Sequence, residues 1–207
     1  MEFTYNHDQL YANISYVDFV SFPIALALTT STGVEKTVAG LCCGGAENIA
    51  AGLLAQQDRD NQRWGDLIVK DAAGELLRVL SPNQGMVLDP SLFVNYFDHA
   101  ASGPFQTGPD AKKNAIIPRL NAEMNRSVIH CCEDEVPCRD RGRYHQHEVT
   151  NHYARLVHEA NVDGKGYAHP YDDVAASGGE DHSGYLSDGA PQRLDVTVGR
   201  KEEGVNP

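Results

Sequence analysis

The sequence has no long hydrophobic run and no basic block. No stretch reaches the roughly 18 apolar residues of a membrane-spanning helix. Met1 is followed by neither the charged n-region nor the apolar h-region of an export signal. The 207 residues carry 17 Lys and Arg against 29 Asp and Glu, a formal net charge of −12. Nucleic-acid binding relies on clustered cations. We therefore expect neither nucleic acid nor membrane as a partner, and a neutral or cationic ligand fits better.

Cysteines are few and odd in number: Cys42, Cys43, Cys131, Cys132 and Cys138. Adjacent cysteines rarely bond to each other because the linkage strains the peptide, so the pairing and the redox compartment stay open. Six side chains of metal-ligand type lie within eighteen residues: His130, Cys131, Cys132, Cys138, His145 and His147. A Cys-x-x-Cys knuckle is absent, which favours a surface loop over a zinc site. We expect no metal and no cofactor.

The hydrophobic content of 41% is enough for a core. Alternation and β-branched residues predict strands over 2–6, 13–22, 23–30, 35–41 and 193–198, with a strand, turn and strand in 64–82. Helical spacing predicts helices over 46–57, 91–97, 117–129 and 152–160. Pro118 suits a first helical position, and Thr150 or Asn151 suits the cap of the last helix. We expect 167–174 to be extended and 176–191 to be a loop.

Two carboxylates stand out near the start, in "MEFTYNHDQLYANISYVDF". In a strand, Glu2, Thr4 and Asn6 share one face, and in the return strand Asp18 shares a face with Tyr16. Two acids on neighbouring strands can face one cleft, as glycoside hydrolysis requires. Spacing alone favours the simpler interpretation of solvated acids on a strand face.

A second candidate is "YAHPYDDV", where aromatic rings precede Asp172 and Asp173. Sugar C–H faces stack on aromatic rings while hydroxyl groups bond to acids, so this composition suits carbohydrate. A turn in which one of the two acids accepts backbone N–H bonds is the alternative, and the residues alone favour it.

The stretch "EFTYN…YANISYVDFVSFPIALALTT" resembles the "EFT…VDxFxxP" segment of the thaumatin-like superfamily, and more closely the glycoside hydrolase family 64 β-1,3-glucanases, particularly fungal members. The likeness returns in "TNHYARLVHEANVDGKGYAHPYDDV", in "LIVKDAAGELLRVLSPNQG" and in the closing "LDVTVG". It runs from Met1 to about Gly199 and is weakest over residues 100–147.

The resemblance implies an endo-type, inverting hydrolysis of β-1,3-glucan. In that family the glutamate of "EFT" is the general acid and the aspartate of "VD" the general base, and these motifs fall on Glu2 and Asp18. The resemblance also implies substrate contacts, which would fall on Thr4, Asn6, Tyr11 and Ser15, with Asp172 or Asp173 in the groove wall. The family often carries Trp at the Tyr11 position and Thr at the Ser15 position.

The implied fold is mainly β with an α/β insertion. A thaumatin-like β-sandwich or barrel would comprise residues 1–43 and 148–200, an inserted mixed α/β region residues 44–147, and a flexible tail residues 201–207, with a groove between the two parts. Family members carry a strand-rich segment ahead of the glutamate, so we expect an incomplete sandwich. A non-catalytic β-glucan-binding module is the alternative function. The substrate implies an extracellular location, and we expect a monomer.

Overall fold

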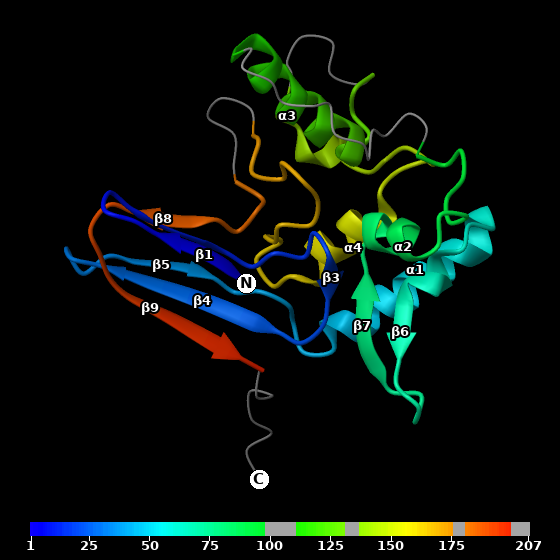
Figure 1. Cartoon of the computed structure of the whole chain (residues 1–207), viewed down its shortest axis with the longest axis horizontal. Helices are drawn as coiled ribbons and strands as arrows, with labels where there is room; N and C mark the ends of the chain where they lie inside the picture. Colours follow the sequence, from blue (N-terminus) through cyan, green and yellow to red (C-terminus); the bar gives the residue numbers. More distant parts are fainter. Residues whose placement is uncertain (98–110, 131–136, 176–180, 200–207) are drawn as a thin grey trace.

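The computed structural model in Figure 1 describes residues 1–97, 111–130, 137–175 and 181–199. Within these residues the fold is mixed α/β, with three small antiparallel sheets. The tail predicted for 201–207 lies outside the described residues, as do Cys131 and Cys132. The division into a sandwich and an inserted region stays a prediction.

Two of the sheets join the beginning of the chain to its end. The first has the order β1-β2-β8, from β1 (Glu2–Tyr5), β2 (Leu10–Asn13) and β8 (Leu186–Asp188). The second has the order β5-β4-β9, from β4 (Ile24–Thr30), β5 (Glu35–Val38) and β9 (Pro191–Val198). Figure 1 shows β1 and β8 lying alongside β5, β4 and β9 on one side of the molecule.

The buried faces of these two sheets share one core. Alternate residues of β2 and β4 are buried, and Leu10, Ala12, Leu26 and Leu28 belong to the same hydrophobic cluster. This period of two is what a half-buried strand produces. Across the edge, the Lys36 Nζ donates to Asp188 Oδ2 at 2.9 Å and so links β5 to β8. The arrangement leaves the other face of β1-β2-β8 to solvent.

The third sheet and the helices form the other half of the molecule. The sheet has the order β3-β7-β6, from β3 (Phe19–Val20), β6 (Ile68–Lys70) and β7 (Leu76–Leu80). The α-helices are α1 (Gly45–Asp60), α2 (Pro82–Leu88), α3 (Ala111–Arg126) and α4 (His152–Ala160), with short 3-10 helices η1 (Trp64–Leu67) and η2 (Arg141–Arg143).

Helices α1 and α4 pack closely in this half. A Cβ at Gly52 would lie 2.5 Å from a terminal methyl of Leu156, so the small residue permits the approach. Trp64 is completely buried, and its ring packs against Phe93 at 4.5 Å and against Tyr96 at 5.5 Å. These aromatic contacts fix the segment that follows α2 onto the helices.

Several sequence predictions are confirmed, with shifted boundaries. Helix α4 begins after Asn151, whose Oδ1 accepts a hydrogen bond from the Ala154 N–H at 3.1 Å. The first hairpin turns at Asn6–Gln9, where the Asn6 N–H donates to the Gln9 carbonyl, so its return strand is β2 and starts earlier than expected. The predicted strand 13–22 contains the last residue of β2, the short β3 and a bridge from Ser15 to Tyr167.

Other predictions are wrong. Residues 91–97 form turns instead of a helix, because Phe93 and Asn95 adopt positive φ angles of 54° and 63°. Pro118 lies inside α3, which begins earlier at Ala111. The segment 167–174 folds into turns after one bridge residue, and α2 has no counterpart among the predicted elements.

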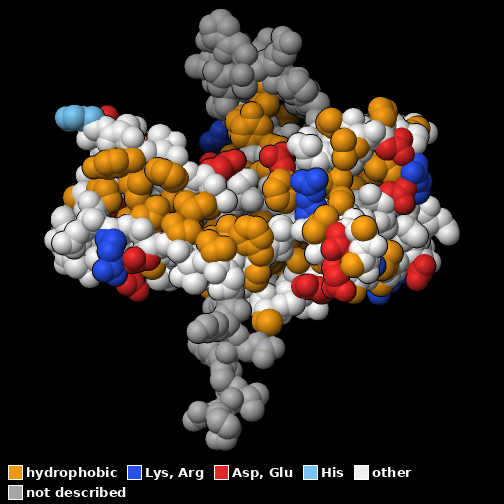
Figure 2. Space-filling model, turned by 60° about the horizontal axis from the view of Figure 1, so that its bottom comes forward, with side chains coloured by type: hydrophobic (Ala, Val, Ile, Leu, Met, Phe, Trp, Pro, Cys, Tyr) orange, Lys and Arg blue, Asp and Glu red, His pale blue; other side chains and the backbone are white. Residues whose placement is uncertain are grey.

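No helix within the described ranges has the length and apolar character that crossing a bilayer requires. In the face shown in Figure 2, exposed hydrophobic side chains extend across the middle, whereas Lys and Arg side chains are few and scattered. Phe3 and Tyr5 are 64% and 69% exposed although they point to the same side as the buried residues of β2. The edge strand β1 therefore lies beyond the shared core.

Candidate functional site

The solvent face of the first sheet brings together three of the residues that the sequence singled out, Glu2, Thr4 and Tyr11. In the antiparallel register Glu2 lies opposite Asn13, and Thr4 lies opposite Tyr11. Side chains of such pairs point to the same face, so Glu2 and Thr4 stand beside Tyr11 and Asn13. The intervening residues of β2 are buried on the other face. We call this surface the polar face.

Aromatic rings extend the polar face toward β8. Tyr11 lies opposite Ser187, and its ring is 5.7 Å from the ring of Tyr185, tilted by 34°. Tyr185 is 36% exposed. The two rings provide a surface of the kind on which sugar rings stack, and sequence reasoning had singled out only Tyr11.

Ser15 joins the polar face to the segment after α4. It forms a parallel bridge with Tyr167, whose hydroxyl donates to Asp173 Oδ1 at 2.7 Å. Burial and the neighbouring Asp173 raise the pKa of the Tyr167 hydroxyl, which therefore stays protonated and keeps donating. Asp173 is exposed. Tyr167 therefore connects Ser15, through the bridge, to the Asp173 carboxylate, through its hydroxyl.

The side chain of Asn6 stabilises the turn of the hairpin. Its Oδ1 accepts hydrogen bonds from the backbone N–H groups of Asp8 and Gln9, both at 2.9 Å. This pattern is an Asx turn, which fixes the loop between β1 and β2. The sequence prediction of a substrate contact at Asn6 therefore concerns a side chain whose carbonyl oxygen already holds the turn.

Asp18 is exposed and lies between the first and third sheets. Its Oδ1 accepts a hydrogen bond from Gln84 Nε2 at 2.8 Å, and its carbonyl accepts from the Ser81 N–H. Ser81 caps α2. Asp18 thus follows Asn13 by five residues along the same chain segment and is oriented by the start of α2.

Beside Asp18 lies a small cavity of about 70 Å³, which Val17 and Ser81 line from this side. Its far wall carries Asn121, Asn125 and Asn151, of which Asn151 Nδ2 donates to Asn125 Oδ1 at 2.9 Å. Ala168, His169 and Pro170 complete the wall on the side of the 167–174 segment. The asparagines were not predicted, since isolated amides in helices α3 and α4 carry no motif.

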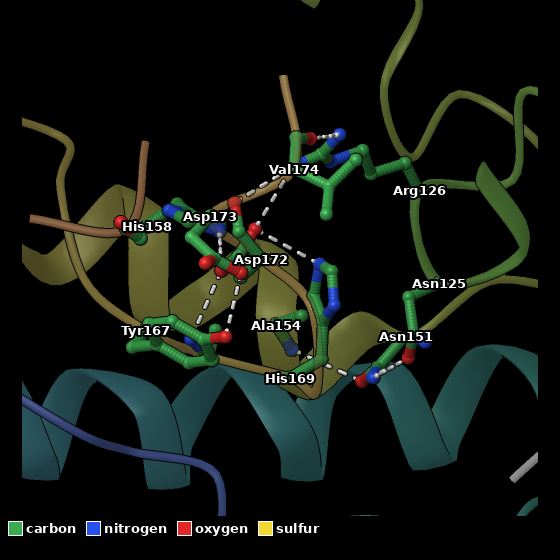
Figure 3. Close-up of polar contacts among 12 residues, drawn as sticks. Asn125, Arg126, Asn151, Ala154, His158, Tyr167, His169, Asp172, Asp173 and Val174 are labelled. Atoms are coloured by element: carbon green, nitrogen blue, oxygen red, sulfur yellow. Dashed lines mark hydrogen bonds and ion pairs between the residues drawn. The ribbon is translucent and has the colours of Figure 1, made fainter. Parts of the chain in front are cut away.

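Asp172 has a different environment from Asp173. Its side chain is fully buried and lies 3.0 Å from His158 Nε2, 3.0 Å from His169 Nε2 and 3.3 Å from Arg126 Nη2 (Figure 3). Burial alone would raise the pKa of the carboxyl, but its contacts with His169 and His158 hold it well below its usual range. Of the two acids predicted for the groove wall, Asp173 is the one that a ligand can reach.

The side chains named for a metal in the 130–147 region do not assemble among the described residues. Cys138 is disulfide-bonded, His145 Nδ1 contacts Thr150 Oγ1 at 3.0 Å, and His147 is exposed. In the described part of the chain, the metal-ligating types converge at His158, His169 and Asp172, whose ligand atoms lie within 4.8 Å of one another. Cys42 and Cys43 are free.

The comparisons with known proteins bear on this arrangement. The family model described as "Beta-1,3-glucanase", that of glycoside hydrolase family 64, matches residues 1–100 and 99–198. The chain belongs to glycoside hydrolase family 64. A search of curated proteins gave no match.

Solved structures of the same family superpose on the chain. A laminaripentaose-producing β-1,3-glucanase in complex with laminaritetraose is 24% identical, with a TM-score of 0.77, over 96% of this chain and 67% of that one. The family 64 laminaripentaose-producing β-1,3-glucanase from Paenibacillus barengoltzii is 28% identical, with a TM-score of 0.68. This chain spans 45% of that protein's length. A family 64 domain from Clostridium beijerinckii, 18% identical, has the same fold with a TM-score of 0.70.

Proposed function

We propose that the polar face binds β-1,3-glucan and hydrolyses it with inversion and in endo fashion, with Glu2 as general acid and Asp18 as general base. The observation that carries the proposal is the register of β1 on β2. It sets Glu2 and Thr4 beside Tyr11 and Asn13 on one solvent face, in a member of a β-1,3-glucanase family. Relatives of this family bind laminari-oligosaccharides.

Glu2 meets one requirement of a general acid through Asn13. The Oδ1 of Asn13 is buried and accepts no hydrogen bond from the described residues. Cβ atoms of directly opposite residues in a sheet lie about 4.5–5.5 Å apart, so this oxygen is an acceptor within reach of a protonated Glu2. A carboxyl group at this position can give its proton to the leaving oxygen.

Asp18 meets the requirements of a base. It is exposed, and its single hydrogen bond among the described side chains comes from the neutral amide of Gln84. A carboxylate with this exposure can take a proton from a water molecule. Inversion requires room for that water, with the carboxyl groups about 6.5–9.5 Å apart.

The test is reducing-sugar release from laminarin by the wild type and by the Glu2→Gln and Asp18→Asn variants. We expect each variant to lose about 10²-fold or more in kcat, as general acid and base substitutions do. Glu35→Gln and Asp58→Asn are matched controls, because both residues are exposed and lie on β5 and α1, away from the polar face. Undiminished rates in both catalytic variants, with controls of equal stability, would contradict the assignment.

A non-catalytic glucan-binding module is the second candidate. It is favoured by the exposure of all four residues of β1, an edge strand, because a loosely held strand would orient its glutamate poorly. Laminarin binding without release of reducing sugar from the folded wild type would support the module over the enzyme.

The finer features of the resemblance remain part of the proposal. We infer an extracellular site of action, since polymeric β-1,3-glucan lies outside the cell, and the likeness to fungal members rests on the sequence motifs. Asp173, Tyr11 and Ser15 contribute substrate contacts in this proposal. We assign Asp172 a structural role: it lies behind the polar face and holds the 167–174 segment in place.

A further inference from the structure

The hydrogen-bond pattern around Asp172 is incomplete. His158 Nδ1 lies 3.3 Å from the carbonyl oxygen of Gly164, and His169 Nδ1 lies 3.1 Å from the carbonyl oxygen of Pro170. A carbonyl oxygen only accepts, so a ring that keeps this contact carries its proton on Nδ1. In a neutral imidazole the other nitrogen then presents a lone pair. In this tautomer both rings offer an acceptor at Nε2.

Both Nε2 atoms nevertheless face the carboxylate of Asp172, at 3.0 Å from Oδ2 for His158 and 3.0 Å from Oδ1 for His169. An ionised carboxylate is an acceptor only. His169 Nε2 is buried, and among the described residues it has no hydrogen-bond partner of good geometry. Lone pairs thus confront one another at two contacts inside the protein.

Three changes can relieve these contacts: transfer of each ring proton from Nδ1 to Nε2, a second proton on each ring, or one cation shared by all three groups. The first gives up both Nδ1 contacts with carbonyl oxygens. Protonating both rings would bury two imidazolium charges beside Arg126, whose side chain is 2% exposed. Burying that much positive charge against a single carboxylate is costly. A divalent ion brings the same charge but bonds directly to the lone pairs that the neutral rings already present.

We propose that His158, His169 and Asp172 form a binding site for a divalent transition-metal ion of the zinc type. Imidazole nitrogen and carboxylate oxygen are ligands that zinc accepts in proteins, and three protein ligands leave one position for water. The ligand atoms lie within 4.8 Å of one another. Tetrahedral zinc with bonds of about 2.0–2.2 Å sets its ligands roughly 3.4 Å apart, which small side-chain rotations reach.

The hydrogen bonds that would hold the metal-binding side chains in place are already present. Histidines that bind metal usually donate their other N–H to a carbonyl or carboxylate, which fixes the ring, and both rings do so here. Asp172 is held in place by the Ala168 N–H at 2.9 Å. A cavity of about 160 Å³ gives access from solvent, and it is lined by His158, Asp172 and Glu159 but also by Arg126, Arg141 and Arg155.

Arg126 weakens the site but does not block it. Its guanidinium is directed mainly at backbone carbonyls, with 2.9 Å to the Asp172 oxygen and 2.7 Å to the Val174 oxygen. It approaches the carboxylate only at Oδ1, at 3.3 Å. The ion would fasten the 167–174 segment to α4, behind the polar face, and would take no part in the hydrolysis proposed above. It would also correct the sequence expectation of a chain without metal.

The experiment is a calorimetric titration of the full chain with Zn²⁺ at pH 7.5, after chelation and dialysis. The protein carries no affinity tag and has the substitutions Cys42→Ser and Cys43→Ser, which remove the two free thiols found among the described residues. We expect one zinc per chain, and a rise in Tm of about 5 °C or more once zinc exceeds its Kd about a hundredfold. His158→Gln and His169→Gln should each weaken binding at least about tenfold.

His7→Gln is the matched control, because that ring is fully exposed and lies in the hairpin turn, and binding should be unchanged. No binding by the folded protein at zinc concentrations of about 100 μM would overturn the proposal. So would binding that both cluster variants retain at full strength. If His169→Gln fails to fold, the wild-type titration and His158→Gln still decide the question, since His158 is at the surface of the cluster.

Discussion

Asp172 and Asp173 are neighbours in sequence, yet they belong to different parts of the molecule. Asp172 is buried between two histidines and Arg126, whereas Asp173 is exposed and accepts a hydrogen bond from Tyr167 at the polar face. An aspartate therefore stabilises the fold at position 172, whereas at position 173 it is accessible to a ligand. The contrast separates the exposed surface, where we propose that the glucan binds, from the buried network behind it.

The two regions should respond oppositely to substitution. On the polar face the side chains are exposed and make few internal contacts, so their loss should reduce binding or turnover and leave folding intact. In the buried network around Asp172 the Arg126 guanidinium and the Ala168 N–H both face the carboxylate, so its loss leaves a buried charge and a buried donor without this partner. Each of the following predictions tests this difference, beginning with the largest effect.

Asp172→Ala should lower the free energy of unfolding by about 3–5 kcal/mol, because it leaves the Arg126 guanidinium buried without its carboxylate. Asp173→Ala should lower it by less than about 1 kcal/mol, the cost of one exposed hydrogen bond. Urea denaturation of both variants measures the difference. Equal losses of stability would remove the distinction between the two acids.

His182 should make the supporting region sensitive to acid. Burial, with the nearby charges of Arg141, His158 and Arg126, lowers the pKa of its imidazole to about 4, and Asp172 opposes the shift. The unfolded chain takes up the proton near pH 6.5, before the folded chain does. The stability contributed by the neutral ring is therefore complete above pH 6.5 and is lost as the pH falls toward 4.

The measurement is the free energy of unfolding at pH 7.0 and 4.5 in the presence of a chelator. The decrease between the two should be smaller in His182→Gln than in the wild type. Burial raises the pKa of Glu123 and gives a change of opposite sign, but both proteins share it. An identical decrease in wild type and variant would show that His182 does not set the acid sensitivity.

Tyr185→Ala should weaken laminari-oligosaccharide binding about tenfold while leaving Tm within a few degrees, because its ring stands beside Tyr11 on the polar face. Tyr5→Ala is the matched control: this ring is also exposed, but it points to the opposite side of the sheet. Isothermal titration compares them. Equal weakening by both substitutions would mean that the polar face is not where the glucan binds.

The sequence predicted the elements whose signals are local. The cap at Asn151, the strands that became β4 and β5, and the helix that became α1 follow from side chains a few residues apart. The hairpin was predicted as well, but its turn was displaced because Asn6 supplies an Asx turn that competes with the expected strand. Resemblance to the family, and not spacing, singled out Glu2 and Asp18.

The buried network could not be predicted from the sequence because it depends on long-range contacts. Arg126 and Asp172 are far apart in the chain and meet only when α3 packs against the turn after Pro170. His158 is partly exposed on α4, yet its Nε2 points inward to Asp172. A turn residue that accepts a backbone N–H was the alternative for "YDDV", and Asp172 does accept the Ala168 N–H.

The most direct test of the account follows a laminarin digest by proton NMR in its first minutes. It reports in one spectrum whether a glycosidic bond is cleaved and which anomer is released. An inverting acid and base pair at Glu2 and Asp18 predicts that the new reducing ends appear first as the α-anomer and then mutarotate. Initial release of the β-anomer, or no new reducing end from folded protein that binds laminarin, would contradict the account.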